Sequence, residues 1–196
     1  MLLSQDEARF PMVPTLTATL GVKGHRPVVG SWDCKHLLYV LAVLNVVTAA
    51  VHATTVESRR DAARKTGKSK NRRLQEGFAA HLRHVGRLYP REKHKRVVLI
   101  IDNAPWHQGE AVRQALDDNP HLELYRLPSY SPKLNVIERF WKLLRRRATH
   151  NRLFDTLADL KRSIRNSLCY FQTLRHRIAS LVAGCYEAKT TASSNL

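Results

Sequence analysis

One unbroken apolar run, residues 97–101 (VVLII), most constrains how this chain folds. Apolar residues fill every position of the run, which is typical of a strand buried on both faces. Such a strand needs a covering layer on each side, so we expect a sheet with helices packed on it. The run ends at Asp102, and Pro105 prevents the strand from continuing regularly. The carboxylate of Asp102 is therefore expected at the edge of the core.

Further strands are predicted on either side of this run. Residues 36–57 are rich in β-branched side chains and are interrupted near residues 45–48, which predicts two antiparallel strands. Residues 122–128 predict another strand. Residues 16–30 mix β-forming residues with Gly and Pro, which indicates a short strand and turns. The opening segment LLSQDEARF is too short to assign from its own pattern.

Helices are indicated where apolar residues recur at helical spacing. This spacing occurs in residues 72–89, in a stretch that begins near residue 134, and in a stretch that Asp155 or Thr156 would cap. A short helix is expected within residues 109–121, and a last one over about 174–186. The predicted fold class is α/β, with a central mixed sheet flanked by helices.

Charge points to a polyanionic partner, because 33 basic residues against 16 acidic ones give a net charge of +17. Residues 59–73, predicted to form a loop, are dominated by Lys and Arg. Residues 139–152 are also basic and contain no acidic residue; the alternative for them is a solvated helix face. The residues predicted to contact DNA phosphates are Lys68, Lys70, Arg72, Arg73, Lys142, Arg145, Arg146 and Arg147.

Other classes of protein are disfavoured. The three cysteines are far apart in sequence and form neither a disulfide framework nor a zinc motif, which suits a reducing compartment. The N-terminus has no signal-peptide pattern. The most apolar stretch, residues 37–51, is shorter than the roughly 20 residues of a membrane span. We therefore expect a cytoplasmic protein that does not enter membranes.

Three carboxylates are candidates for chemistry. Asp102 ends the most hydrophobic strand, although Asp is also common there as a turn former. Glu138 lies at the margin of an apolar helix stripe, and its alternative is a surface ion pair with Lys142. Asp6 is weaker in isolation, and Asp33 is a rival that better fits a turn. If such carboxylates converge, they bind hard cations such as Mg²⁺.

Three segments, SQDEARF, VVLIIDNAPWH and LPSYSPKLNVIERFW, occur in this order along the chain. They resemble the three catalytic blocks of a mariner-superfamily DDE transposase of the bacterial insertion-sequence branch. The matching acidic residues are Asp6, Asp102 and Glu138, and the last two are separated by 138 − 102 = 36 positions. The third block, Ser-Pro-x-Leu-Asn-x-x-Glu, is the most specific of the three.

The resemblance implies an RNase H-like fold, with a catalytic domain over residues 1–170 and a C-terminal helix and polar tail over residues 171–196. It also implies two Mg²⁺ ions, with Mn²⁺ as a substitute. Asp6, Asp102 and Glu138 would be both the catalytic residues and the metal ligands. Asn103, His107 and Asn135 would position these ligands or the substrate; local turn hydrogen bonds are the alternative for Asn103 and His107.

The implied function is DNA transposition, by metal-dependent cleavage at transposon ends and strand transfer into a TA target. The implied partners are double-stranded DNA and a second copy of the chain. Because Asp6 comes so early, we expect the helix-turn-helix region of longer relatives to lie outside this chain and to be supplied by a separate chain or a frameshift fusion. Two alternatives remain: a truncated or domesticated DNA-binding relative without catalysis, and a general nuclease.

Overall fold

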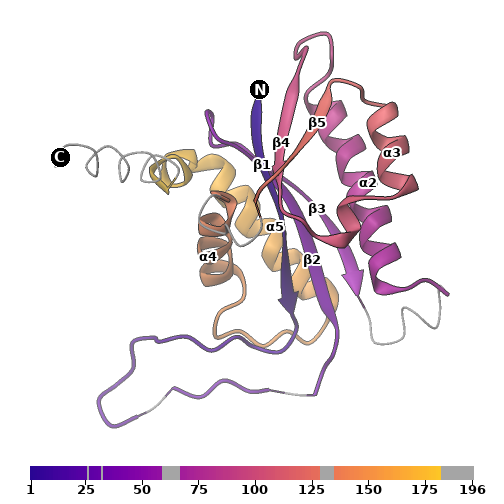
Figure 1. Cartoon of the computed structure of the whole chain (residues 1–196). Coiled ribbons are helices and arrows are strands. Elements are labelled where there is room, and N and C mark those ends of the chain that lie inside the picture. Colours follow the sequence, from indigo (N-terminus) through magenta and orange to yellow (C-terminus); the bar gives the residue numbers. More distant parts are fainter. Residues whose placement is uncertain (26, 32, 59–66, 129–134, 182–196) are drawn as a thin grey trace, which may run out of the picture.

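The structure, a computed structural model, is built around one five-stranded sheet with strand order β3-β2-β1-β4-β5 (Figure 1). It describes residues 1–25, 27–31, 33–58, 67–128 and 135–181. The strands are β1 (Leu2–Pro11), β2 (Leu37–Asn45), β3 (Val51–Ser58), β4 (Val97–Ile101) and β5 (Leu122–Arg126).

The sheet is mixed, and β1 lies at its centre. β1, β2 and β3 form antiparallel neighbours, whereas β1 is parallel to β4 and β4 is parallel to β5. Parallel neighbours require crossover connections. Helix α2 (Lys70–Leu88) connects β3 to β4, and helix α3 (Glu110–Asp117) connects β4 to β5.

Each face of the sheet is covered by its own pair of helices (Figure 1). Side chains alternate between the two faces along a strand. Leu3 of β1 therefore packs in the core beneath α2 and α3, while Phe10 of the same strand packs beneath α4 (Ile137–Ala148) and α5 (Leu157–Thr173). Because both faces are covered, the strands can be apolar throughout, as residues 97–101 predict.

Most of the predicted elements are present. The strand pair within 36–57 and the strand at 97–101 are confirmed, as is the strand predicted at 122–128, which ends at Arg126. The helices predicted at 72–89 and within 109–121 are α2 and α3. Helix α5 begins after Thr156, whose side chain accepts a hydrogen bond from the Asp159 amide, so the predicted cap is also confirmed.

Three predictions need correction or completion. The unassigned first segment is the central strand, because both edges of its backbone find a neighbouring strand. The described part of 16–30 contains no strand, and its Gly and Pro residues leave it as a loop. The predicted loop at 59–73 gives way to α2 at Lys70, because the Ser69 side chain caps the helix by accepting from the Arg72 amide. Residues 59–66 lie outside the described residues.

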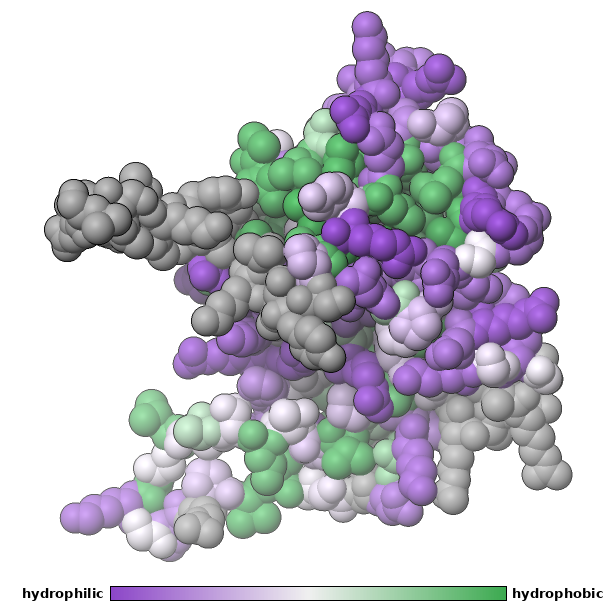
Figure 2. Space-filling model, in the orientation of Figure 1, coloured by the Kyte–Doolittle hydropathy of each residue, from purple (hydrophilic) through white to green (hydrophobic). Residues whose placement is uncertain are grey.

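The loop between β1 and β2 forms an arm that projects from the body of the molecule (Figure 1). Figure 2 shows hydrophobic residues along this arm. Leu20 and Val28 are 99% and 91% exposed. The arm is fastened at its base, where Asn151 exchanges side-chain hydrogen bonds with the backbone of Thr17.

The predicted division at residue 170 stays a prediction, and that position lies inside α5. Residues 175–181 are helical, while the rest of the helix predicted over 174–186 lies outside the described residues. In the described part of the chain, no helix combines the length and the hydropathy that crossing a membrane would require.

Candidate active site

Asp6 lies in the middle of β1 and is 7% exposed. Its side chain is on the α4 and α5 side of the sheet, where Oδ2 accepts a 2.9 Å hydrogen bond from Nε1 of Trp141 in α4. Burial, together with the negative charges of Glu7 and Glu138, raises the pKa of Asp6 to about 7, against the lowering effect of the Trp141 hydrogen bond. A cation beside Asp6 would relieve the cost of ionising it.

Asp102 directly follows β4, as the sequence predicts. β1 and β4 pair in parallel with Leu2 opposite Val98 and Ser4 opposite Ile100. Continued by two residues, this register brings position 102 opposite position 6. The side chain of Asp102 is 51% exposed. A hydrogen bond with His107 lowers the pKa of Asp102, although partial burial opposes this effect.

Glu138 lies in the first turn of α4, which begins at Ile137, three residues later than the expected start near 134. The Glu138 side chain is exposed, and no ion pair to Lys142 occurs among the described residues. Trp141 follows Glu138 by three positions, so both side chains lie on neighbouring parts of one helix face. The Trp141 hydrogen bond to Asp6 therefore turns the face that carries Glu138 toward β1.

The tightest cluster of potential metal ligands differs from the predicted set. Among the described residues, the group whose ligand atoms lie within 4.8 Å of one another is Glu7, Asp102 and His107. Asp6 and Glu138 do not belong to that group. Of the three predicted carboxylates, the cluster therefore contains Asp102 alone, while electrostatic coupling links Glu138 to Asp6.

His107 joins two acidic residues. Its Nδ1 lies 3.1 Å from Oδ1 of Asp102, and its Nε2 lies 2.9 Å from Oε1 of Glu7. Burial alone lowers the pKa of His107, but the hydrogen bonds to Asp102 and Glu7 outweigh it and raise the pKa to about 9. Sequence reasoning missed Glu7. The only sequence feature that could indicate Glu7 is its position directly after Asp6 in a strand, which places its side chain on the opposite face of the sheet.

The two predicted asparagines hold backbone segments together. Nδ2 of Asn103 donates to the Leu127 carbonyl at 2.8 Å, which ties the segment after β4 to the segment after β5. Asn135 accepts a hydrogen bond from the Ser4 hydroxyl and is 6% exposed. Its Nδ2 also donates to the Gln5 carbonyl, at 3.5 Å. Asn135 thereby fastens the start of α4 to β1 immediately before Asp6.

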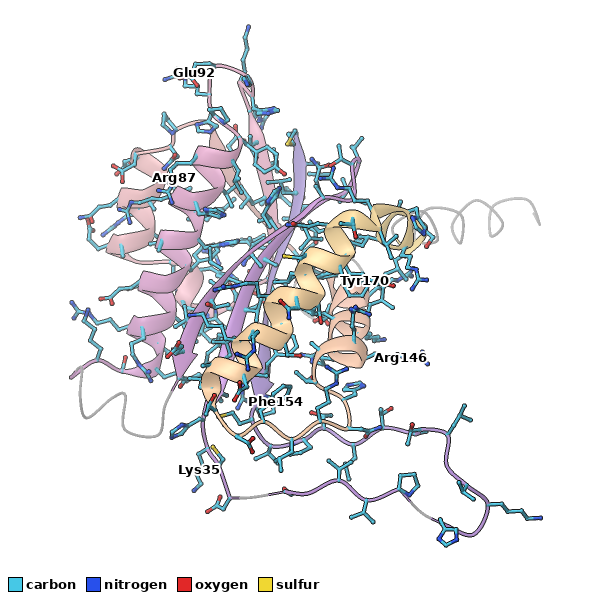
Figure 3. All side chains as sticks on the ribbon, turned by 180° about the vertical axis from the view of Figure 1, so that it is seen from behind. Lys35, Arg87, Glu92, Arg146, Phe154 and Tyr170 are labelled. Carbon is cyan, nitrogen blue, oxygen red and sulfur yellow. The ribbon has the colours of Figure 1, made fainter. Side chains whose placement is uncertain are left out.

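The predicted DNA-binding residues of α4 follow Glu138 along the helix. Lys142 and Arg146 are exposed. The guanidinium of Arg145 lies 5.5 Å from the Phe10 ring centre, and that of Arg147 lies 3.4 Å from the Tyr170 ring centre. Figure 3 shows Arg146 on α4, on the same side of the molecule as Tyr170. A groove of about 760 Å³ separates the base of the arm from the end of α4, and its basic lining residues are Arg146, His150 and Arg152.

The second basic group is at the start of α2. Lys68 forms a salt bridge with Glu76 at 2.8 Å, and Arg72 lies 3.5 Å from the same carboxylate. The ammonium of Lys70 lies 5.9 Å from the ring centre of Trp106. Nε of Arg73 is buried without a hydrogen-bond partner among the described residues. The Glu76 pairing reduces the net positive charge of this group relative to that on α4.

The sequence profile of the DDE superfamily endonuclease family matches residues 1–161. The chain is 30% identical over 162 residues to the insertion element IS630 uncharacterized 39 kDa protein of Shigella sonnei, which covers 83% of this chain and 43% of that protein. It is 34% identical over 85 residues to the uncharacterized protein y4pE/y4sA of Sinorhizobium fredii, which covers 43% of this chain and 58% of that protein.

Solved structures of Mos1 share the fold. The Mos1 mariner paired end complex with Mg matches with a TM-score of 0.60 at 17% identity, over 95% of this chain and 55% of that one. The Mos1 mariner transposase catalytic domain matches with a TM-score of 0.56 at 16% identity, over 95% of this chain and 81% of that one. The fold is RNase H-like, as predicted, and the chain spans less than half the length of the IS630 protein.

Proposed function

Because this chain belongs to the DDE superfamily endonuclease family, we propose that it is the catalytic domain of an insertion-sequence transposase. Its activity would be metal-dependent cleavage and joining of DNA phosphodiester bonds. One observation carries the proposal: Trp141 of α4 is hydrogen-bonded to buried Asp6 of β1. This bond fastens the helix that carries Glu138 onto the strand that pairs with β4, which Asp102 follows.

The acidic residues suit divalent cations. Asp6, Asp102 and Glu138 would hold two Mg²⁺ ions, with Mn²⁺ as a substitute, because carboxylate oxygens are the ligands that these cations prefer. The raised pKa of buried Asp6, to which Glu7 and Glu138 both contribute, supports this fit. When bound, such ions activate the nucleophile and stabilise the leaving oxygen of a phosphodiester. Mg and Mn are named for the Mos1 complexes that share the fold.

The chain's own residues would hold these ligands still. Trp141 fixes one oxygen of Asp6, and His107 fixes one oxygen of Asp102. Asn135 holds the start of α4, and with it Glu138, against β1. Preorganised ligands need no rearrangement when the reaction begins, which lowers its barrier.

The partner would be double-stranded DNA, first transposon ends and then a TA target, in the cytoplasm. The exposed basic residues of α4, which come after Glu138 along the helix, would contact DNA phosphates. Transposon ends are named for one Mos1 complex that shares the fold. We further propose that the chain acts as a homodimer. A helix-turn-helix region, supplied by a separate chain or by a frameshift fusion, would recognise the ends.

The proposal is tested by incubating the purified chain with supercoiled plasmid in Mg²⁺, in Mn²⁺ and in a chelator. We expect nicking with either metal and none with the chelator. Asp102→Ala should abolish nicking, whereas Asp117→Ala, a change at the exposed end of α3, should not. Thermal unfolding should show that both variants remain folded at the assay temperature.

Each other outcome would lead to a different conclusion about the site or the function. Nicking that survives Asp102→Ala contradicts the assigned site. DNA binding without cleavage, even when a helix-turn-helix domain is supplied, would identify a non-catalytic relative. Cleavage that never yields joined products would identify a nuclease.

A further inference from the structure

A buried line of polar side chains crosses from the centre of the sheet to the candidate site. Gln5 and Glu7 are neighbours on the α2 face of β1, and Nε2 of Gln5 donates to Oε1 of Glu7 at 2.9 Å. The same oxygen lies 2.9 Å from Nε2 of His107, and Nδ1 of His107 lies 3.1 Å from Oδ1 of Asp102. Glu7 thus reaches Asp102 through one imidazole ring.

This line lies against the apolar core beneath α2. The side chains of Glu7 and His107 are 4% and 0% exposed. The His107 ring lies 4.4 Å from the ring centre of Phe78, a core residue of α2. Burying charged groups costs free energy that their pairing often fails to recover, and apolar residues of similar volume are often as stabilising or more so. Fold stability alone therefore gives a weak reason for Glu7 at this position.

At the far end of the line, the two carboxylate oxygens of Asp102 have different surroundings. Oδ1 accepts a hydrogen bond from the Ala104 amide at 2.9 Å and lies 3.1 Å from Nδ1 of His107, which is also hydrogen-bonded to the Asp102 carbonyl at 3.2 Å. No hydrogen bond from a described residue reaches Oδ2. Since half of the side chain is exposed, Oδ2 is the oxygen left open to the site. Fixing Oδ1 therefore fixes the direction in which Oδ2 points.

We propose that Glu7 is a positioning residue that orients the Asp102 carboxylate through His107. This inference rests on the proposed function, in which Asp102 holds a divalent cation. Glu7 does not serve as a ligand itself, because it lies on the opposite face of β1 from Asp6 and its Oε1 already faces Gln5 and His107. Partners that orient ligands in this way typically contribute ten- to a hundredfold to metal affinity.

Two substitutions distinguish the effect of the Glu7 side chain's length from the effect of its charge. Glu7→Gln removes the charge but keeps the length that an oxygen needs to reach His107. Glu7→Asp keeps the charge but withdraws it by one methylene. A positioning role predicts that Glu7→Asp weakens Mn²⁺ binding by about tenfold or more, and that Glu7→Gln weakens it less. If Glu7 acted only through its charge, the order would be reversed.

The measurement is calorimetric titration of the full chain with Mn²⁺ alone, with thermal unfolding recorded for each variant. Glu92→Asp is the matched control, because it makes the same change at an exposed residue in the turn between α2 and β4 (Figure 3). This variant should bind Mn²⁺ as the parent does. Equal affinity for the parent, Glu7→Asp and Glu7→Gln overturns the inference. So does weaker binding by Glu7→Gln than by Glu7→Asp.

A second pair of variants tests the route through His107 and serves if Glu7→Asp does not fold. His107→Gln should weaken Mn²⁺ binding by about tenfold. Adding Glu7→Gln to His107→Gln should cause no further loss, because the line is already broken. Additive losses would mean that Glu7 acts by another route. Asp102→Asn separates the two proposals: if Mn²⁺ binding survives this change, the proposed function fails, and otherwise only the Glu7 results decide the inference.

Discussion

Nε1 of Trp141 donates a hydrogen bond of 2.9 Å to Oδ2 of Asp6, and the two residues are 135 positions apart in the chain. The bond joins α4 to the central strand within the core. Trp141 is 1% exposed and also packs edge-on against Phe10. One side chain thus both fills the core and holds a candidate metal ligand.

Trp141→Phe should lower the free energy of unfolding by about 2 kcal/mol, the usual contribution of a hydrogen bond to a charged group. It should also weaken Mn²⁺ binding, because Asp6 loses the donor that orients it. Denaturant unfolding and calorimetry measure the two effects. Trp106→Phe is the matched control, since Nε1 of Trp106 has no hydrogen-bond partner among the described residues. A loss of stability in the control as large as in Trp141→Phe would contradict this explanation.

Asn135→Ala should reduce the rate of DNA nicking more than it reduces Mg²⁺-independent DNA binding. The substitution frees the start of α4 from Ser4 and Gln5, so Glu138 loses its fixed position. We expect a cost of about 1–3 kcal/mol in the free energy of unfolding. Ser4→Ala removes one partner of the same pair, so the double variant should lose less than the sum of the single losses. Strict additivity would show that the Ser4–Asn135 hydrogen bond contributes nothing.

Acid should destabilise the fold through His81. Burial, together with the charges of His84 and His52, lowers the pKa of His81 to about 3. Below about pH 6.5 the His81 imidazole is protonated in the unfolded chain but stays neutral in the folded chain. The free energy of unfolding is therefore unaffected by His81 above that pH and falls as the pH is lowered toward 3. The loss approaches about 1.4 kcal/mol per pH unit.

His81→Asn removes this titration, so its stability should fall less steeply between pH 7 and pH 4.5 than that of the parent. Denaturant unfolding at several pH values measures the slope. His25→Asn, a change in the exposed arm, is the control and should follow the parent. Parallel curves for the parent and His81→Asn would rule out His81 as the source of the acid sensitivity.

DNA binding should depend strongly on salt, because phosphate contacts release counterions. Lys142→Ala and Arg146→Ala should each reduce the slope of log K against log salt concentration by about 0.9. Arg83→Ala is the matched control, since Arg83 pairs with Asp118 at 2.9 Å and belongs to α2, on the other side of the sheet. A slope near zero for the parent chain would exclude the electrostatic interface.

The predictions that held rest on local patterns. The run at 97–101 is a strand because its residues are apolar throughout, and Asp102 follows that strand because the apolar run stops there. The predicted start of α2 at residue 72 is two positions too late and overlaps the predicted loop over residues 59–73, because a basic stretch with no apolar period hides the Ser69 cap. The central strand cannot be assigned from its own pattern, because its ten residues form a strand only between two neighbouring strands.

The amino-acid sequence by itself determined the layered α/β class and the net basic charge, and it indicated three candidate carboxylates, since apolar periodicity, charge composition and short motifs do not depend on the tertiary fold. The tertiary structure alone decided that Asp6 is buried against Trp141 and that Glu7 reaches Asp102 through His107. These relationships join residues about a hundred or more positions apart along the chain. Strand register and helix packing bring such residues together, and no local pattern encodes either one.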